Sequence, residues 1–200
     1  MATAALTYYT PEEYLALERH AEFKSEYVDG RIIAMTGAQR PHNLIVSNLD
    51  REIGSRLLDS PCEVYPADMR VKVSASGDYV YPDVVVSCDP QFEDETFDTL
   101  LTPVLIVEVL SDSTEPYDRG KKFSLYRSIE SLREYVLLSQ KEVSAEHYVR
   151  EGDFWRFTSL GDPEALLVLA SIGVEIPLRS IYHKALTPTR RVPRSVERIE

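Results

Sequence analysis

The sequence predicts an α/β fold in which helices flank a mixed β-sheet and an antiparallel meander is added to it. Two apolar runs, 80–87 and 104–110, lack the polar alternation of half-exposed strands, as is typical of strands covered on both faces. Residues 41–58 carry apolar side chains at every fourth position, which indicates a helix that packs on such a sheet. Residues 134–158 contain alternating stretches separated by a turn at Gly152, which predicts the meander.

The N-terminal part predicts a capped helix followed by a hairpin. The segment Thr-Pro-Glu-Glu at 10–13 is a capping box with proline at the first helical position, so a helix should run to about Glu22. Asp29-Gly30 lies between two short apolar stretches, which is the strongest short hairpin pattern in the chain. The remaining expected elements are short strands at 62–65, 69–73, 166–170 and 174–176 and a final helical turn at 177–182.

Each of the two apolar runs contains one carboxylate, Asp83 in the first and Glu108 in the second. An ionised carboxylate in a buried strand costs several kcal/mol unless a partner compensates it. A divalent cation would compensate both, and oxygen ligands on Mg²⁺ are a common means of activating water and holding a phosphate. The alternative is that each carboxylate lies at a strand end, solvated or bonded to a turn.

The segment after Glu108 predicts a helix with a lysine on its inner face. Ser111 to Pro116 is rich in residues that begin helices. Asp118 and Lys122 share one face with the apolar residues up to Ile129, so the Lys122 amine is expected to point inward. An inward lysine needs an anionic partner. Alternatively, Lys122 extends its stem over the core and pairs with Asp118 one turn back.

Together these residues resemble the Uma2 family of the PD-(D/E)XK restriction-endonuclease-like superfamily. The resemblance rests on Pro82-Asp83, on Glu108 within its apolar strand and on the D-x-x-x-K-x-x-x-Y pattern from Asp118 to Tyr126. It spans roughly residues 8–182 and implies a restriction-endonuclease-like fold. One position departs from the superfamily pattern, since Leu110 replaces the lysine expected two residues after Glu108. In the superfamily that lysine can migrate to the next helix, and Lys122 is the corresponding position.

The resemblance also implies roles for two residues outside this stretch. Glu26 corresponds to the first acidic position of the family and is expected to extend the metal shell or hold a water molecule. The alternative is a solvated carboxylate on an edge strand. His42 lies where the family has a histidine and could orient a phosphate or transfer a proton. A histidine at a helix start is also a common packing or capping residue.

Composition restricts what the protein binds. The formal net charge of −11 argues against a broad phosphate-binding surface, so nucleic acid can bind only where basic residues gather on one face. Two cysteines are too few for a disulfide framework and have no metal-ligand spacing. Because no apolar run reaches membrane-spanning length and the N-terminus shows no export signal, we expect a cytoplasmic protein without membrane contact.

These observations predict an endonuclease that hydrolyses DNA with Mg²⁺ or Mn²⁺ held by Asp83 and Glu108, with Lys122, Glu26 and His42 completing the catalytic set. Two alternatives stay open. One is a catalytically silent nuclease fold that binds nucleic acid or protein, and the other is a metal phosphohydrolase for small substrates. We expect one domain at 8–182 and a flexible, arginine-rich and proline-rich tail at 183–200. A homodimer is possible, because nucleases of this superfamily often act as dimers.

Overall fold

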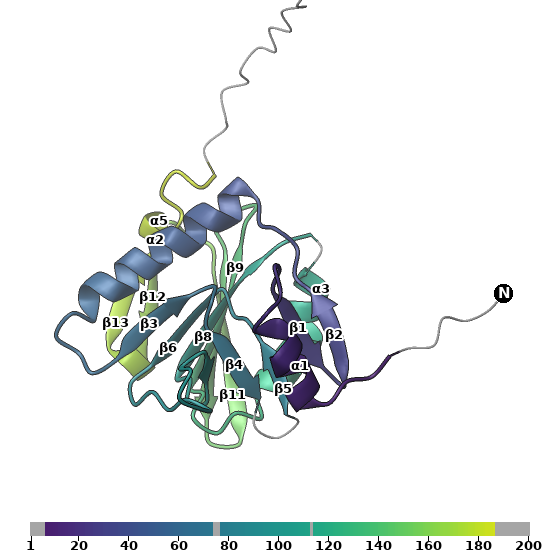
Figure 1. Cartoon of the computed structure of the whole chain (residues 1–200). Helices are drawn as coiled ribbons and strands as arrows, with labels where there is room; N and C mark the ends of the chain where they lie inside the picture. Colours follow the sequence, from purple (N-terminus) through teal and green to yellow (C-terminus); the bar gives the residue numbers. More distant parts are fainter. Residues whose placement is uncertain (1–6, 74–76, 113, 187–200) are drawn as a thin grey trace, which may run out of the picture.

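The computed structural model describes residues 7–73, 77–112 and 114–186, and a six-stranded mixed sheet forms its centre (Figure 1). The strand order is β11-β10-β9-β8-β6-β3, and only β8 and β9 run parallel. The strands are β3 (Glu63–Pro66), β6 (Val84–Ser87), β8 (Leu105–Leu110), β9 (Glu134–Ser139), β10 (Ala145–Glu151) and β11 (Phe154–Leu160). The expected mixed sheet with an antiparallel meander, β9 to β11, is therefore confirmed.

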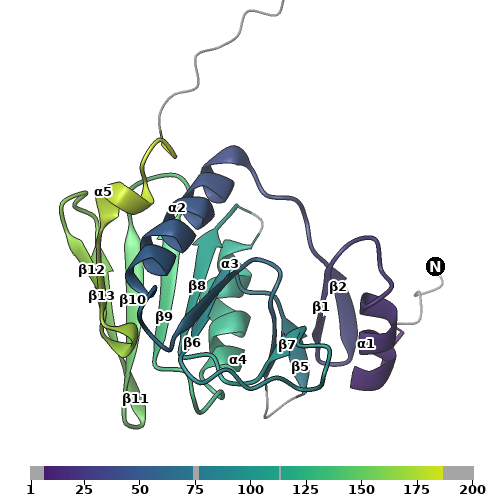
Figure 2. The ribbon, with the colours of Figure 1, turned by 60° about the vertical axis from the view of Figure 1, so that its left-hand side comes forward.

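One face of this sheet is covered by helix α2 (Arg40–Arg56), a small hairpin of β12 (Leu166–Leu169) and β13 (Val174–Pro177), and helix α5 (Leu178–Ile181) (Figure 2). Alternate residues of the central strands point into this layer and pack against the apolar stripe of α2. The buried side chains include Ile45, Leu49 and Ile53 from α2 and Val84, Val107 and Val109 from the sheet. The fourfold spacing in the sequence thus identified the buried face of α2 correctly.

The opposite face packs against a second sheet of order β2-β1-β5-β4-β7 and against helix α4 (Phe123–Tyr126). These strands are β1 (Ser25–Val28), β2 (Arg31–Ala34), β4 (Arg70–Val73), β5 (Asp78–Val80) and β7 (Thr99–Leu100). The β1–β2 hairpin turns at Asp29 and Gly30, whose φ angles of 51° and 76° are those of the predicted tight turn. Helix α1 (Pro11–Glu18) has the predicted capping box but ends before Glu22.

The apolar run 80–87 does not form one strand, which corrects the sequence prediction. It is divided between β5 and β6, and these belong to different sheets. Pro82 lies at the break, because it has no N–H for a sheet hydrogen bond and its ring fixes φ. Asp83 consequently lies just before β6 rather than within a strand.

The predicted helix after Glu108 is present but is not a regular α-helix. It consists of α3 (Glu115–Tyr117), a five-residue π-helical turn at Asp118–Lys122, and α4. The expected inner face from Asp118 to Ile129 is nevertheless buried. Single π-turns within helices occur frequently at functional sites.

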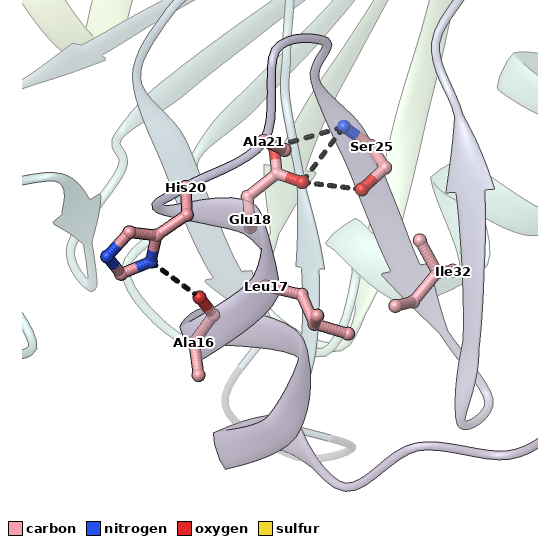
Figure 3. A pocket seen from close by; sticks show the side chains of 7 residues that line it. All are labelled: Ala16, Leu17, Glu18, His20, Ala21, Ser25 and Ile32. Carbon is pink, nitrogen blue, oxygen red and sulfur yellow. Dashed lines mark hydrogen bonds between the residues drawn. The ribbon is translucent and has the colours of Figure 1, made fainter.

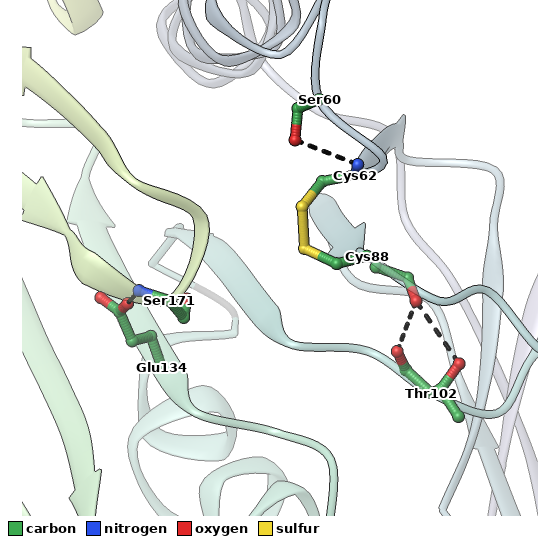
Figure 4. Close-up of a disulfide and its surroundings, with 7 residues drawn as sticks. Ser60, Cys62, Cys88, Thr102, Glu134 and Ser171 are labelled. Atoms are coloured by element: carbon green, nitrogen blue, oxygen red, sulfur yellow. Dashed lines mark hydrogen bonds between the residues drawn. A yellow bond between two sulfur atoms is a disulfide. The ribbon is translucent and has the colours of Figure 1, made fainter.

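Cys62 and Cys88 are joined by a disulfide, which their spacing in the sequence did not predict (Figure 4). Glu63 pairs with Ser87 in the register of β3 and β6, so the two cysteines face each other at the next position. Disulfides are more typical of oxidising compartments than of the cytoplasm, so the expected cytoplasmic location stays a prediction.

No helix in the described part of the chain is long and apolar enough to cross a membrane. The assignment of residues 8–182 to one domain stays a prediction. Most of the predicted flexible tail, at 187–200, lies outside the described residues.

Candidate active site

The two central carboxylates approach each other where β6 begins and β8 nears its end. Val84 pairs with Val107, so the antiparallel register places Asp83 opposite Glu108 and directs both toward the same face. Asp83 Oδ2 accepts a hydrogen bond of 2.7 Å from the backbone N–H of Val109. The expectation that two neighbouring strands bring these carboxylates together agrees with this geometry.

The Lys122 amine points inward, as predicted. Its Nζ lies 2.9 Å from Glu108 Oε1 and 3.0 Å from Glu26 Oε1, and Asp118 Oδ1 is more distant at 3.9 Å. The lysine side chain is only 6% exposed. The alternative in which Lys122 reaches solvent and pairs mainly with Asp118 is therefore wrong. The π-helical turn that ends at Lys122 delivers the amine to the sheet.

Glu26 belongs to the same cluster and is not a solvated edge carboxylate. Strand β1 lies between β2 and β5, and Glu26 is buried there. Its Oε1 accepts a hydrogen bond of 3.1 Å from the backbone N–H of Tyr81, and its Oε2 accepts one of 3.4 Å from the Tyr117 hydroxyl. Both contacts hold the carboxylate toward Lys122.

His42 contacts the cluster through Asp83. It lies in the first turn of α2, and its Nε2 is 3.1 Å from Asp83 Oδ2. Its Nδ1 is buried and makes no hydrogen bond with the described residues. Asp83 and His42 are more exposed, at 18% and 14%, than the side chains around Lys122. The His42–Asp83 pair is therefore more accessible to solvent than Lys122 and the acids in contact with it.

The cluster contains more acids than its lysine can neutralise. Among the described residues, Lys122 is the amine that Glu26, Glu108 and Asp118 share, and Asp83 is close enough to act on Glu108. Burial raises the pKa of Glu108 well above its ordinary value; Lys122 opposes that rise, and Asp83 and Asp118 add to it. Burial lowers the pKa of Lys122, but the surrounding carboxylates outweigh burial and hold it well above its ordinary value. The surplus of buried negative charge favours the uptake of a cation or a proton.

Sequence reasoning missed two members of this site. Burial raises the pKa of Asp118, whose carboxylate is the third acid near Lys122. The Tyr126 hydroxyl donates a hydrogen bond of 2.7 Å to Glu108 Oε1. Both residues belong to the D-x-x-x-K-x-x-x-Y pattern, whose spacing places them on the face of Lys122. The pattern therefore contained the information, although neither Asp118 nor Tyr126 was predicted to be a site residue.

The donor set fits a hard divalent ion that keeps part of its water shell. Within residues 7–73, 77–112 and 114–186, no three His, Cys, Asp or Glu side chains form a group that could hold a metal ion alone. Mg²⁺ is usually held by one or two carboxylates together with water and substrate phosphate rather than by a full protein cage. Asp83 and Glu108 supply two such carboxylates, and neither Asp83 Oδ1 nor Glu108 Oε2 accepts a hydrogen bond from another described residue.

A hollow of about 460 Å³ between α1 and the β1–β2 hairpin offers less chemistry (Figure 3). Its buried acid, Glu18, accepts hydrogen bonds from the backbone and hydroxyl of Ser25 and from the Tyr81 hydroxyl. This carboxylate is already compensated by the protein, so we assign it a structural role.

Comparisons with known proteins agree with this geometry. The profile of the Uma2 family, described as "Putative restriction endonuclease", matches residues 11–179. Two uncharacterised proteins of the cyanobacterium Synechocystis, sll1609 and slr1290, are 39% and 37% identical to the chain. The alignments cover 80% and 86% of this chain and 92% and 90% of the relatives. A crystal structure from Anabaena variabilis, described as "a putative nuclease belonging to DUF820", superposes with a TM-score of 0.71 at 19% identity. The match covers 89% of this chain and 99% of that one.

Proposed function

Because this chain belongs to the Uma2 family and has a nuclease-like fold, we propose that it is a Mg²⁺-dependent or Mn²⁺-dependent endonuclease that hydrolyses phosphodiester bonds of DNA. One observation carries the proposal. A buried lysine amine contacts two carboxylates, Glu108 and Glu26, beside the strand end that holds Asp83. A fold needs no such surplus of buried acid for its stability, whereas a metal-assisted phosphate reaction does.

Each residue then has a role that its contacts support. Asp83 and Glu108 would hold the ion, which when bound supplies Lewis-acid stabilisation of the phosphate. Lys122 would position the attacking water and stabilise the negative charge that develops on the phosphate oxygens. Glu26 holds the Lys122 amine in place, and His42 orients the Asp83 carboxylate. The His42–Asp83 pair is partly exposed, so these two residues lie on the solvent side of the cluster.

Two observations favour the competing functions. Leu110 replaces the usual lysine, which favours a fold that binds nucleic acid or protein without cutting. The net charge of −11 favours a small phosphate ester over a long polyanion, because a small substrate needs no extended basic surface. Both alternatives use the same cluster, so they are distinguished by which substrates the protein binds or hydrolyses.

The test is a substrate panel with purified protein in Mg²⁺, Mn²⁺ or EDTA. Supercoiled plasmid, single-stranded DNA, RNA and a simple phosphoester are incubated with wild type and with Asp83→Asn. The proposal expects plasmid nicking that requires metal and falls at least about a hundredfold in Asp83→Asn. Hydrolysis of the phosphoester alone would identify a small-substrate phosphohydrolase, and binding without cutting would identify the silent module.

The remaining expectations are that DNA is the partner, that the protein works in the cytoplasm and that it forms a homodimer. Strand β11 lies at an edge of the central sheet, and its residues Phe154 and Phe157 are exposed. An exposed strand edge can pair with a second chain. Light scattering at micromolar concentration tests the dimer, since a monomer mass would contradict it.

A further inference from the structure

A hollow of about 600 Å³ lies beside the acid–lysine cluster and is not explained by the roles assigned above. Tyr117 forms the wall between them. Its hydroxyl donates to Glu26 Oε2, and its ring centroid is 5.9 Å from Lys122 Nζ. Lys121 lines the hollow while its neighbour Lys122 enters the cluster. A ligand in the hollow would therefore be adjacent to the groups that act on phosphate.

The hollow combines two cations with an exposed aromatic ring. Arg31 and Lys121 line it together with Tyr8, whose residue is 59% exposed. The Lys121 amine has one described partner, Asp29 at 2.9 Å, and both side chains of that pair are largely exposed. The three charged side chains sum to about +1, in contrast to the net charge of −11 of the whole chain. The hollow is therefore slightly positive on an otherwise acidic protein, which favours a phosphate group there over other parts of the chain.

The Tyr8 ring is held in place before any ligand binds. Its Cδ1 lies 3.0 Å from the position that a Cβ on Gly30 would occupy, so the ring rests closely on the hairpin turn where glycine leaves room for it. The backbone N–H of Tyr9 donates to the Gly30 carbonyl at 2.9 Å. The Arg31 guanidinium donates to the Tyr8 hydroxyl at 3.2 Å and lies 5.5 Å from its ring centroid. A fixed, exposed ring beside cations is the arrangement on which unpaired bases stack.

We propose that this hollow binds one nucleotide of an unpaired nucleic acid strand. Its base stacks on Tyr8, its phosphate lies between Arg31 and Lys121, and the neighbouring phosphodiester reaches the cluster at Lys122. The assignment rests on the proposed function, because it treats the cluster as the place where the strand is cut. It adds that the substrate strand is unpaired at the site of cutting, so a supercoiled plasmid would be nicked where its strands are locally open.

Binding is measured apart from cutting. Fluorescence anisotropy of a labelled 20-nucleotide thymidine strand is recorded in EDTA at low salt, where no metal-dependent cleavage occurs. Arg31→Ala and Lys121→Ala should each weaken binding at least about fivefold and reduce the salt slope by about one. Arg156→Ala is the matched control, because it removes the same charge from an exposed arginine on β11, and it should leave binding unchanged.

Two further variants separate recognition from a general charge effect or a folding defect. Tyr8→Ala should weaken binding of the thymidine strand about tenfold but leave binding of an abasic strand of equal length unchanged. Asp29→Asn should tighten binding, because it releases Lys121 and asparagine tolerates the positive φ at this position. The proposal would be overturned if Tyr8→Ala, Arg31→Ala and Lys121→Ala bound the thymidine strand as tightly as Arg156→Ala does. It would also be overturned if wild type bound the abasic strand as tightly as the thymidine strand.

The outcome is distinguishable from a failure of the nuclease assignment. If strand binding depends on Tyr8 and Lys121 but no cleavage occurs in Mg²⁺ or Mn²⁺, the nucleotide-binding hollow stands and the nuclease proposal is rejected. If the protein nicks plasmid but Tyr8→Ala, Arg31→Ala and Lys121→Ala bind the strand normally, the nuclease proposal stands and the nucleotide-binding hollow is rejected.

Discussion

Replacement of Lys122 by methionine provides a quantitative test of the buried cluster. The substitution keeps the apolar stem but removes the ammonium, which lies 2.9 Å from Glu108 and 3.0 Å from Glu26. The three acids around it, including Asp118, have side chains only 4–6% exposed. Removal of one partner from such a buried group costs about 3–5 kcal/mol. For a chain of this size the cost corresponds to a melting temperature lowered by roughly 6–20 °C.

The loss should depend on pH in a defined direction. The folded pKa of Lys122 is raised, so its contribution in wild type is fully present below the ordinary lysine value near 10.5 and is lost as the pH rises through the folded value. In the variant the acids have no cation, and burial already raises the pKa of Glu108 and Asp118. Protonation relieves them as pH falls, so the difference between wild type and variant should be larger at pH 8 than at pH 5.

Thermal melts in EDTA at pH 5 and pH 8 provide the assay. Lys141→Met serves as the control, because that lysine pairs with Asp112 on the surface and its loss should not change the melt. Addition of Glu108→Gln to Lys122→Met should restore part of the stability, since it removes one uncompensated charge. A Lys122→Met melt within about 1 °C of wild type at pH 8 would refute the buried ion-pair account.

Three further predictions concern other parts of the chain. The Cys62–Cys88 disulfide closes a loop with a sequence separation of 26, so its reduction should lower the unfolding free energy by about 3 kcal/mol. Urea titrations measure this loss, and an unchanged urea midpoint after reduction would contradict the bond. Glu134→Gln should lower the melting temperature more at pH 7 than in acid. Burial raises the pKa of this carboxyl, yet hydrogen bonds outweigh burial and depress it, so its contribution is lost as the pH falls through the depressed pKa of the folded state; an equal loss at pH 7 and in acid would count against this. Adding Leu110→Lys to Lys122→Met should recover part of the lost nicking, because Leu110 and Glu108 lie on the same face of strand β8. A folded double variant without any recovery would contradict the idea that the lysine can act from either position.

The sequence predicted the sheet and the convergence of the site because both depend on local periodicity. Strand β8 and the inner face from Asp118 to Tyr126 follow from apolar runs and fourfold spacing. A buried acid and an inward lysine on consecutive elements each need a partner of opposite charge, and each is the nearest such partner for the other. Glu26 and His42 depended instead on the family resemblance, because their contacts span 96 and 41 positions in the chain.

Other features could not be predicted because they depend on tertiary pairing. The break at Pro82 separates two strands that one apolar run suggested as a single strand, and it assigns them to different sheets. The pairing of Cys62 with Cys88 follows from the register of β3 and β6, which spacing alone does not contain. The π-helical turn before Lys122 has no sequence pattern comparable to that of a capping box.

Plasmid nicking by Glu108→Gln in Mn²⁺ tests the central claim most directly. The substitution keeps the shape of a side chain buried in β8, and Asp112→Asn is the control, because it removes an acid from the surface shortly after that strand. The account predicts metal-dependent nicking by wild type and the control, and a loss of at least about a hundredfold in a Glu108→Gln protein that still melts cooperatively. Equal nicking by all three proteins, or nicking that persists in EDTA, would contradict it.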